Sequence, residues 1–193
     1  SNTGGQQSKA TPIGASAKFA SAGKEVQKKD LGLMAMSYGH VYVASIAMGA
    51  KDNQTVKAFV EADSYDGPSI IIAYSHCIAH GYDLSLGLSQ QKLAVESGIW
   101  PLYRFDPRRI DQGLPPLQLA YKPKDINVLE YMRHETRFRM VEKMDPARFK
   151  VLAEKALLAA ERRVSLYRQL SAMPYGGGQH GRTEAPPPGS AAG

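Results

Sequence analysis

Between residues 41 and 74 the chain reads VYVASIAMGAKDNQTVKAFVEADSYDGPSIIIAY, two apolar runs separated by an amphipathic stretch. The first run, residues 41–47, is β-branched and aromatic and predicts a strand. The second, residues 69–74, is continuously apolar, which is typical of a strand covered on both faces. Strand, helix and strand at this spacing form a βαβ unit, so the two strands should be parallel.

The helix between the two strands is expected over residues 54–64. Asp52 stands where a side chain can cap its first turn. Val56, Phe59 and Val60 fall on one face of this helix and give it an apolar side.

The topology has a functional consequence, because parallel strands end on the same edge of their sheet. In open α/β sheets, ligands bind in crevices outside the carboxyl ends of the strands. Residues 49–52 follow the first strand, and Ser75-His76-Cys77 follows the second. The loop at residues 1–5 would reach the same edge if a strand preceded it.

The rest of the chain predicts further helices and two short strands. The long helix that Pro146 opens has the clearest pattern, an apolar stripe at steps of three and four residues. Its members are Phe149, Leu152, Ala156, Ala160, Val164, Tyr167 and Leu170. The other expected elements are a helix capped by Asp30, a helix over 84–97, strands over 100–105 and 117–121, and a helix over 125–141. The Gly/Pro-rich residues after Pro174 are expected to be disordered.

Composition sets broad limits on the class of protein. With 193 residues and 43% hydrophobic side chains, the chain can bury a core, and it has no apolar run long enough to span a membrane. It has no signal-peptide pattern, and its single cysteine fits a reducing cytoplasm. The first residues have the composition of a loop, so we expect the natural protein to extend further upstream.

The net charge of +6 comes from the second half of the chain. Residues 101–175 hold fifteen basic and nine acidic side chains, whereas residues 1–100 hold eight of each. Such an excess indicates a solvated helical face, a surface for an acidic protein, or a nucleic-acid site. We expect no nucleic-acid partner, because no recognised motif or row of aromatic residues accompanies the arginines.

The residue types alone leave the functional site open. Cys77 is the only thiol, and a lone cysteine after a buried strand is usually a small core side chain. A zinc site at His76-Cys77-Ile78-Ala79-His80 would need a further ligand from elsewhere. The loop Ser1-Asn2-Thr3-Gly4-Gly5 suits phosphate or a polar cofactor, but it also has the composition of a flexible loop. Together these residues predict an α/β ligand-binding half-domain.

Several sequence blocks together resemble the C-terminal region of pyruvate:ferredoxin (flavodoxin) oxidoreductases. The resemblance is close over residues 1–105 and looser to about 172. The blocks are SNTGGQQSKATPIGASAKFASAGK, KKDLGLMAMSYGHVYVASIAMGA, GPSIIIAYSHCIAHG and QQKLAVESGIWPLYRFDP. The resemblance implies an α/β fold in which residues 1–83 are part of a thiamine-diphosphate-binding domain. It further implies a connecting segment over 84–122, a helical extension over 123–173 and a tail over 174–193.

The resemblance also implies a reaction and site residues. Pyruvate would be oxidatively decarboxylated with coenzyme A to acetyl-CoA and carbon dioxide, and electrons would pass through 4Fe–4S clusters to ferredoxin or flavodoxin. Asn2 resembles the asparagine that ends the family's thiamine motif, which implies a catalytic and cofactor-binding role, with Ser1 beside it. Cys77 resembles the last of four cysteines that hold one 4Fe–4S cluster. The Mg²⁺ ligands and the other three cysteines would lie upstream, so we expect a homodimeric full-length enzyme and an inactive fragment.

A second hypothesis treats the chain as a stand-alone α/β binding module. In that case the basic helices over residues 124–170 would engage an acidic partner.

Overall fold

The structure, a computed structural model, describes residues 3–123 and 125–175 and contains one mixed sheet. The strands lie in the order β2-β1-β3-β4. The β1 and β2 strands are parallel, with Tyr42 opposite Ser69 and Ile46 opposite Ala73, as the βαβ pattern predicts. The β3 strand runs antiparallel to both β1 and β4. The bounds are β1 (Tyr42–Ile46), β2 (Ser69–Ala73), β3 (Tyr103–Phe105) and β4 (Leu117–Leu119). The predicted α/β class is confirmed.

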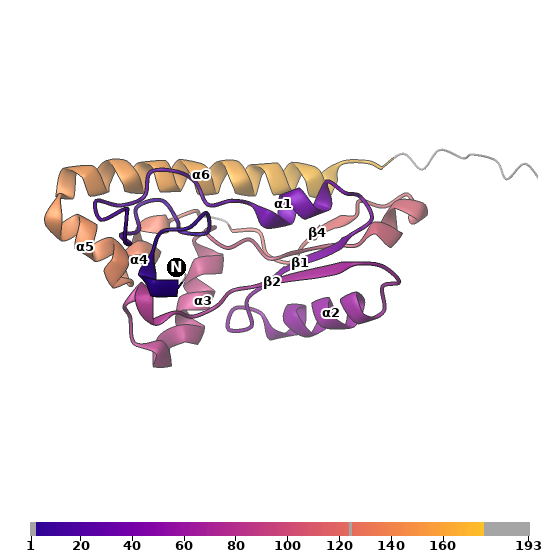
Figure 1. The fold of residues 1–193 in the computed structure, drawn as a ribbon. Coiled ribbons are helices and arrows are strands. Elements are labelled where there is room, and N and C mark those ends of the chain that lie inside the picture. Colours follow the sequence, from indigo (N-terminus) through magenta and orange to yellow (C-terminus); the bar gives the residue numbers. More distant parts are fainter. Residues whose placement is uncertain (1–2, 124, 176–193) are drawn as a thin grey trace, which may run out of the picture.

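Helices cover both faces of the sheet (Figure 1). On one face lies α2 (Asp52–Asp63), and on the other lie α1 (Leu31–Met36) and the C-terminal half of α6 (Pro146–Ala172). Side chains of β1 alternate between the two layers, as in any strand. Tyr42, Ala44 and Ile46 pack with Ala58 of α2, whereas Val43 packs in the same cluster as Tyr167 of α6.

The apolar face predicted for α2 is the exposed one. Val56, Phe59 and Val60 are 64%, 55% and 63% exposed, and the face against the sheet carries Ala58 and polar side chains. The short side chain of Ala58 allows close approach to a sheet face that already holds Tyr42. The predicted cap is also wrong: Asp52 is the first helical residue, and Lys51 occupies the capping position without a side-chain hydrogen bond.

The expectation that β2 is covered on both faces is confirmed in part: Ile70 and Ile72 pack against the cluster that holds Tyr167, and Ile71 packs against the cluster that holds Ala58 on the other face. The β2 strand is an edge strand of this sheet, with β1 as its single neighbour among the described strands. Its isoleucines are only partly buried. A continuous apolar run shows that a strand prefers burial, but it does not show how many strands this chain places beside it.

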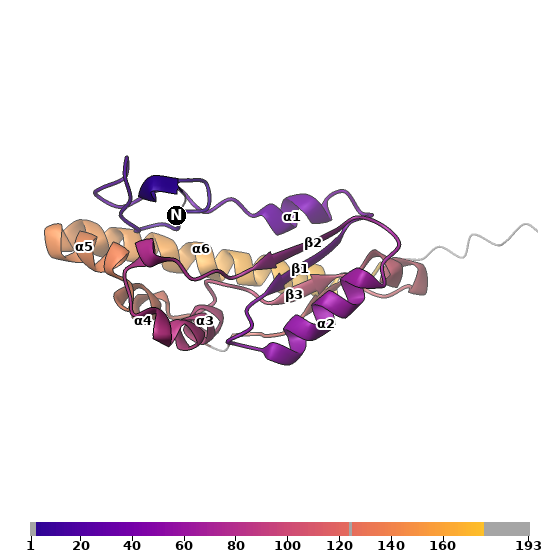
Figure 2. The ribbon, with the colours of Figure 1, turned by 60° about the horizontal axis from the view of Figure 1, so that its bottom comes forward.

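The other half of the molecule is a helical bundle built on the N-terminal half of α6 (Figure 2). Its core gathers the N-terminal segment, α3, α4, α5 and α6, with Ile13, Tyr131, Phe138, Val141 and Leu152 among its buried residues. The predicted helix over 125–141 is two helices, because the backbone of Glu135 is extended between them. The bounds are α3 (Gly87–Glu96), α4 (Val128–Arg133) and α5 (Thr136–Met144).

The long C-terminal helix matches its prediction. It begins at Pro146, where Asp145 accepts a hydrogen bond from the Arg148 backbone N–H at 2.9 Å, and its stripe is buried at five positions. These are Phe149, Leu152, Ala160, Val164 and Tyr167. The predicted tail, from residue 176 onward, lies outside the described residues. Short 3₁₀ turns complete the chain: η1 (Thr3–Gly5), η2 (Ile78–His80), η3 (Leu84–Leu86) and η4 (Pro107–Gln112). No helix within the described ranges is both long and apolar enough to cross a membrane.

Candidate functional site

The segments that follow β1 and β2 lie together at the carboxyl edge of the sheet. The Tyr74 backbone N–H, directly after β2, donates to the Ile46 carbonyl at the end of β1 over 3.0 Å. From there residues 47–51 turn into α2, and residues 74–77 leave the sheet toward η2. The prediction that both segments reach one edge is confirmed.

A glutamine on α3 joins the two segments. The Gly49 backbone N–H donates to Gln91 Oε1 at 2.8 Å, and Gln91 Nε2 lies 3.0 Å from His76 Nε2. Gln91 is buried, so its amide holds one fixed position between the loops. This bridge fixes the residue that immediately precedes Cys77.

Two glycines allow close packing at the same edge. A Cβ placed on Gly87, the first residue of α3, would lie 2.5 Å from Cε1 of His76. A Cβ on Gly49 would lie 2.7 Å from Cα of Leu88. At Gly49 a side chain would meet the backbone of α3, so only glycine allows this close approach, whereas at Gly87 a side chain would displace the His76 ring.

Cys77 lies at the end of this braced segment and is half-buried. Its backbone is extended, and its carbonyl accepts from the His80 backbone N–H at 3.0 Å, which starts η2. Among the described residues, no three His, Cys, Asp or Glu side chains gather as a metal site. The chain contains one cysteine, so it can offer one thiolate to a cluster whose other ligands come from elsewhere.

The N-terminal loop is described from Thr3 onward. Asn2 and Ser1 lie outside the described residues, so the structure does not test their predicted roles. The next residues form η1, which lies in the half of the molecule that holds the helical bundle (Figures 1 and 2). The Lys18 backbone N–H donates to the Gly5 carbonyl at 3.0 Å, which joins this turn to the N-terminal segment that follows it.

A buried charge pair lies behind the edge. The Glu135 carboxylate is fully buried and accepts from Arg137 Nε at 2.6 Å and from Gln90 Nε2 at 2.9 Å. Tyr131 lies within the same group, and its hydroxyl accepts from Arg137 Nη2 at 3.3 Å. This buried group was not predicted from the sequence. The only sequence feature that points to it is the pair of opposite charges, Glu135 and Arg137, set between apolar helical residues.

This buried group also holds the strand end. The hydroxyl groups of Tyr74 and Tyr131 lie 3.0 Å apart, and Tyr74 directly follows β2. Burial, and then the charge of Glu135, raise the pKa of Tyr74, so its hydroxyl keeps its proton at neutral pH. The helical bundle therefore anchors the segment that carries Cys77.

His80 completes the group without forming a hydrogen-bonded ion pair. Its Nδ1 lies 3.9 Å from Glu135 Oε1, a distance too long for a hydrogen bond. Burial, followed by the charges of Arg137 and His76, lowers the pKa of His80 to about 3. The ring is therefore neutral at neutral pH.

Many arginines of the basic half are paired within the chain. Five of those in the described ranges contact a carboxylate at 3.1 Å or less, which reduces the charge available to an acidic partner. The pairs are Arg104–Glu61, Arg108–Asp106, Arg133–Glu142, Arg137–Glu135 and Arg148–Glu25.

Comparison with known proteins gives strong matches to individual proteins, although no family model matches the sequence. The chain is 61% identical over 171 residues to the pyruvate-flavodoxin oxidoreductase of Rhodospirillum rubrum, and 56% identical over 171 residues to that of a Nostoc species. It is 48% identical over 171 residues to the pyruvate:ferredoxin oxidoreductase of Moorella thermoacetica. Each match covers 89% of this chain but only 14% or 15% of the relative. The chain therefore spans about a seventh of the length of these relatives.

Proposed function

We propose a function for this chain from one premise: over 89% of its length it is homologous to a segment of the pyruvate-flavodoxin oxidoreductases. The chain would be the part of such an enzyme that completes a thiamine diphosphate site and provides one ligand of a 4Fe–4S cluster. The whole enzyme would convert pyruvate and coenzyme A to acetyl-CoA and carbon dioxide and pass two electrons to flavodoxin or ferredoxin. The observation that carries this proposal is the 61% identity over 171 residues.

The geometry of the carboxyl edge supports the role of Cys77. A cluster ligand needs a rigid backbone at a point where the chain leaves the core. The segment from Tyr74 to Cys77 is held by the Ile46 carbonyl, by Gln91 and by the Tyr131 hydroxyl. The bound cluster would carry electrons one at a time, and the chain's own contribution is to hold one thiolate in place.

Asn2 would act beside the cluster, at the thiamine diphosphate site. An amide side chain donates and accepts hydrogen bonds without adding charge, so it can orient a cofactor or a substrate carboxylate. The Mg²⁺ ligands would belong to the rest of a homodimeric enzyme in the cytoplasm.

The direct test is the reaction of the full-length protein loaded with its cofactors. Pyruvate should reduce flavodoxin or ferredoxin only when coenzyme A is present, with one acetyl-CoA formed per two electrons. Omission of coenzyme A and replacement of pyruvate by lactate are the controls. Absence of acetyl-CoA from a protein that holds its cofactors would reject the proposed function.

The isolated 193-residue chain should not bind thiamine diphosphate tightly. The proposed ligands for Mg²⁺ and the diphosphate lie outside this chain, and without them the charged cofactor has no counter-charge. Calorimetric titration with thiamine diphosphate and Mg²⁺ should give no saturation below about 1 mM, which corresponds to about −4 kcal/mol. A micromolar dissociation constant would mean that this chain holds a complete site.

In the full-length protein, Asn2→Ala should lower kcat by roughly 100-fold, the size of effect seen when one positioned hydrogen-bond donor is removed from an active site. Iron content should stay unchanged, because the amide is not a cluster ligand. Asn53→Ala is the matched control, since Asn53 is exposed at the start of α2. Wild-type turnover in the Asn2 variant would remove this residue from the site.

A further inference from the structure

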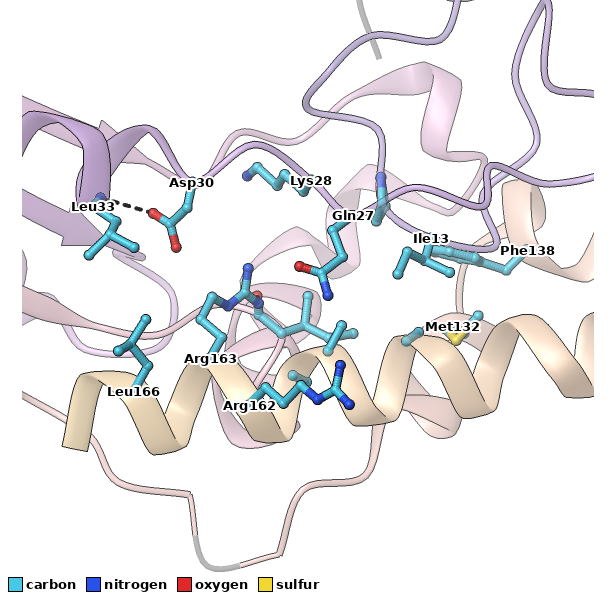
Figure 3. Close-up of a pocket in the computed structure, with 15 residues that line it drawn as sticks. Ile13, Gln27, Lys28, Asp30, Leu33, Met132, Phe138, Arg162, Arg163 and Leu166 are labelled. Carbon is cyan, nitrogen blue, oxygen red and sulfur yellow. Dashed lines mark hydrogen bonds between the residues drawn. The ribbon is translucent and has the colours of Figure 1, made fainter. Parts of the chain in front are cut away.

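A cavity of about 280 Å³ lies between α6 and the N-terminal segment that crosses it (Figure 3). Its walls come from residues 12–13, from residues 27, 28 and 30, from Ile99, and from α1, α4, α5 and α6. None of the residues that form the carboxyl edge lines it. The cavity is therefore a feature separate from the candidate functional site.

The inner wall of the cavity is apolar. Ile13, Met132 and Phe138, which belong to the core of the helical bundle, form one side. On α6 the apolar stripe has alanines here, at Ala156 and Ala160, where its neighbouring turns carry larger side chains. These small residues leave the space that the cavity occupies.

Two cations face the cavity from opposite sides. Lys28 enters from the N-terminal segment and Arg163 from α6 (Figure 3). One terminal nitrogen of Arg163 donates to the Ile99 carbonyl, while its Nε is buried and has no hydrogen-bond partner among the described residues. Lys28 Nζ lies 4.2 Å from the centroid of the Trp100 ring. Neither side chain forms an ion pair with a carboxylate in the part of the chain that the structure describes.

Asp30 also lines the cavity, but its carboxylate already accepts hydrogen bonds from other groups of the chain. Asp30 Oδ1 accepts from the Leu33 backbone N–H at 3.1 Å, and the Tyr167 hydroxyl lies 2.9 Å and 2.8 Å from the two carboxylate oxygens. The described lining residues include three cations, Lys28, Arg162 and Arg163, against this one anion. The lining therefore carries a net charge of +2 above an apolar wall.

We propose that this cavity binds a small organic carboxylate with a short apolar group. The carboxylate would lie between Lys28 and Arg163, the two cations that line the cavity from opposite sides. The apolar group would lie against Ile13 and Phe138. Arginine and carboxylate match in charge and planar geometry, and the volume is at the small end of the range for ligand pockets.

Benzoate is a suitable probe for the isolated chain, and its uncharged analogue benzamide is the matched control ligand. Benzoate should bind with a dissociation constant of roughly 0.1–1 mM, which is reasonable for so few atoms. Benzamide should bind at least about tenfold more weakly, since it lacks the charge. The methyl signal of Met132 in a ¹³C-methyl-methionine NMR spectrum should shift on binding, because this residue lines the cavity.

Variants distinguish specific binding in the cavity from nonspecific binding of benzoate to the protein surface. Lys28→Gln should weaken benzoate binding about tenfold, and Ala160→Leu should abolish it by filling the space. Lys29→Gln is the matched control, because Lys29 is exposed and does not line this cavity. The thermal unfolding midpoint of each variant verifies that it folds. Arg163 itself is not replaced, because it also donates a hydrogen bond to the Ile99 carbonyl and its loss could unfold the chain.

The pH dependence gives an independent measurement. Burial and the charge of Arg163 lower the pKa of Lys28 to about 8, against an opposing effect of Asp30 and a further lowering by Arg137. Benzoate affinity should therefore fall as pH rises through 8, and Lys28→Arg should remove this fall. The proposal is overturned if benzoate and benzamide bind alike, if Met132 does not respond, or if Lys28→Gln binds as the wild type does.

Discussion

Replacement of Cys77 by serine in the full-length protein should remove one 4Fe–4S cluster, or shift its potential, and stop electron delivery to flavodoxin or ferredoxin. A thiolate is the usual ligand of such clusters, and the hydroxyl of serine is a harder and far less acidic group. Iron analysis and the EPR spectrum of the reduced protein measure the cluster directly. Thiamine diphosphate binding should survive, because the fold does not depend on a half-buried side chain of this size.

The matched control for this variant is Ser75→Ala. Ser75 lies two residues before Cys77, and its hydroxyl donates to the His76 carbonyl at 3.2 Å in an exposed position. Its loss should leave iron content and electron transfer unchanged. If the Cys77 variant instead keeps every iron atom, the wild-type EPR signal and full activity, the thiol serves only in packing.

Glu135→Ala should lower the free energy of unfolding by roughly 3–5 kcal/mol, the usual effect of removing one partner of a buried ion pair. The carboxylate is fully buried, and its loss leaves the buried Arg137 guanidinium without this counter-charge. It also removes the acceptor of Gln90 Nε2 at 2.9 Å. Urea denaturation of the 193-residue chain, followed by circular dichroism, measures the change.

Two further variants identify the cause of this destabilisation. Glu142→Ala removes the ion-pair partner of the exposed Arg133 and should lower the free energy of unfolding far less. The double variant Glu135→Leu with Arg137→Met should recover much of the loss, since it leaves no unpaired buried charge. If the Glu135 and Glu142 single variants lower the free energy of unfolding equally, burial of the Glu135–Arg137 pair does not increase the cost of breaking it.

Periodicity in the sequence predicts the elements that depend on local pattern. The parallel pair β1–β2 and the stripe along α6 follow from spacing alone, and both are observed. The pattern of apolar residues did not show which face of α2 packs on the sheet, because the packed face carries Ala58, whose small side chain lies in the cluster with Tyr42. The break at Glu135 was missed because its partner Gln90 lies 45 residues away, beyond any local window.

Part of the candidate site could likewise be predicted from local sequence, and part could not. Topology brings the residues after β1 and β2 to one edge, so that edge could be predicted from the sequence. The bridge through Gln91 and the close approach at Gly87 depend on how α3 packs, which no motif reports. The roles of Asn2 and Cys77 come from resemblance to a family and stay predictions.

The length of α6 affects how the chain folds during synthesis. At 27 residues it is about 40 Å long, and it packs on the helical bundle with one half and on the sheet with the other. Its Tyr167 hydroxyl bonds Asp30, 137 residues earlier in the chain. While α6 is still inside the ribosome, the bundle core and one face of the sheet are both open to water. Neither half can complete its core before α6 emerges, so the growing chain keeps apolar surface exposed to water until then.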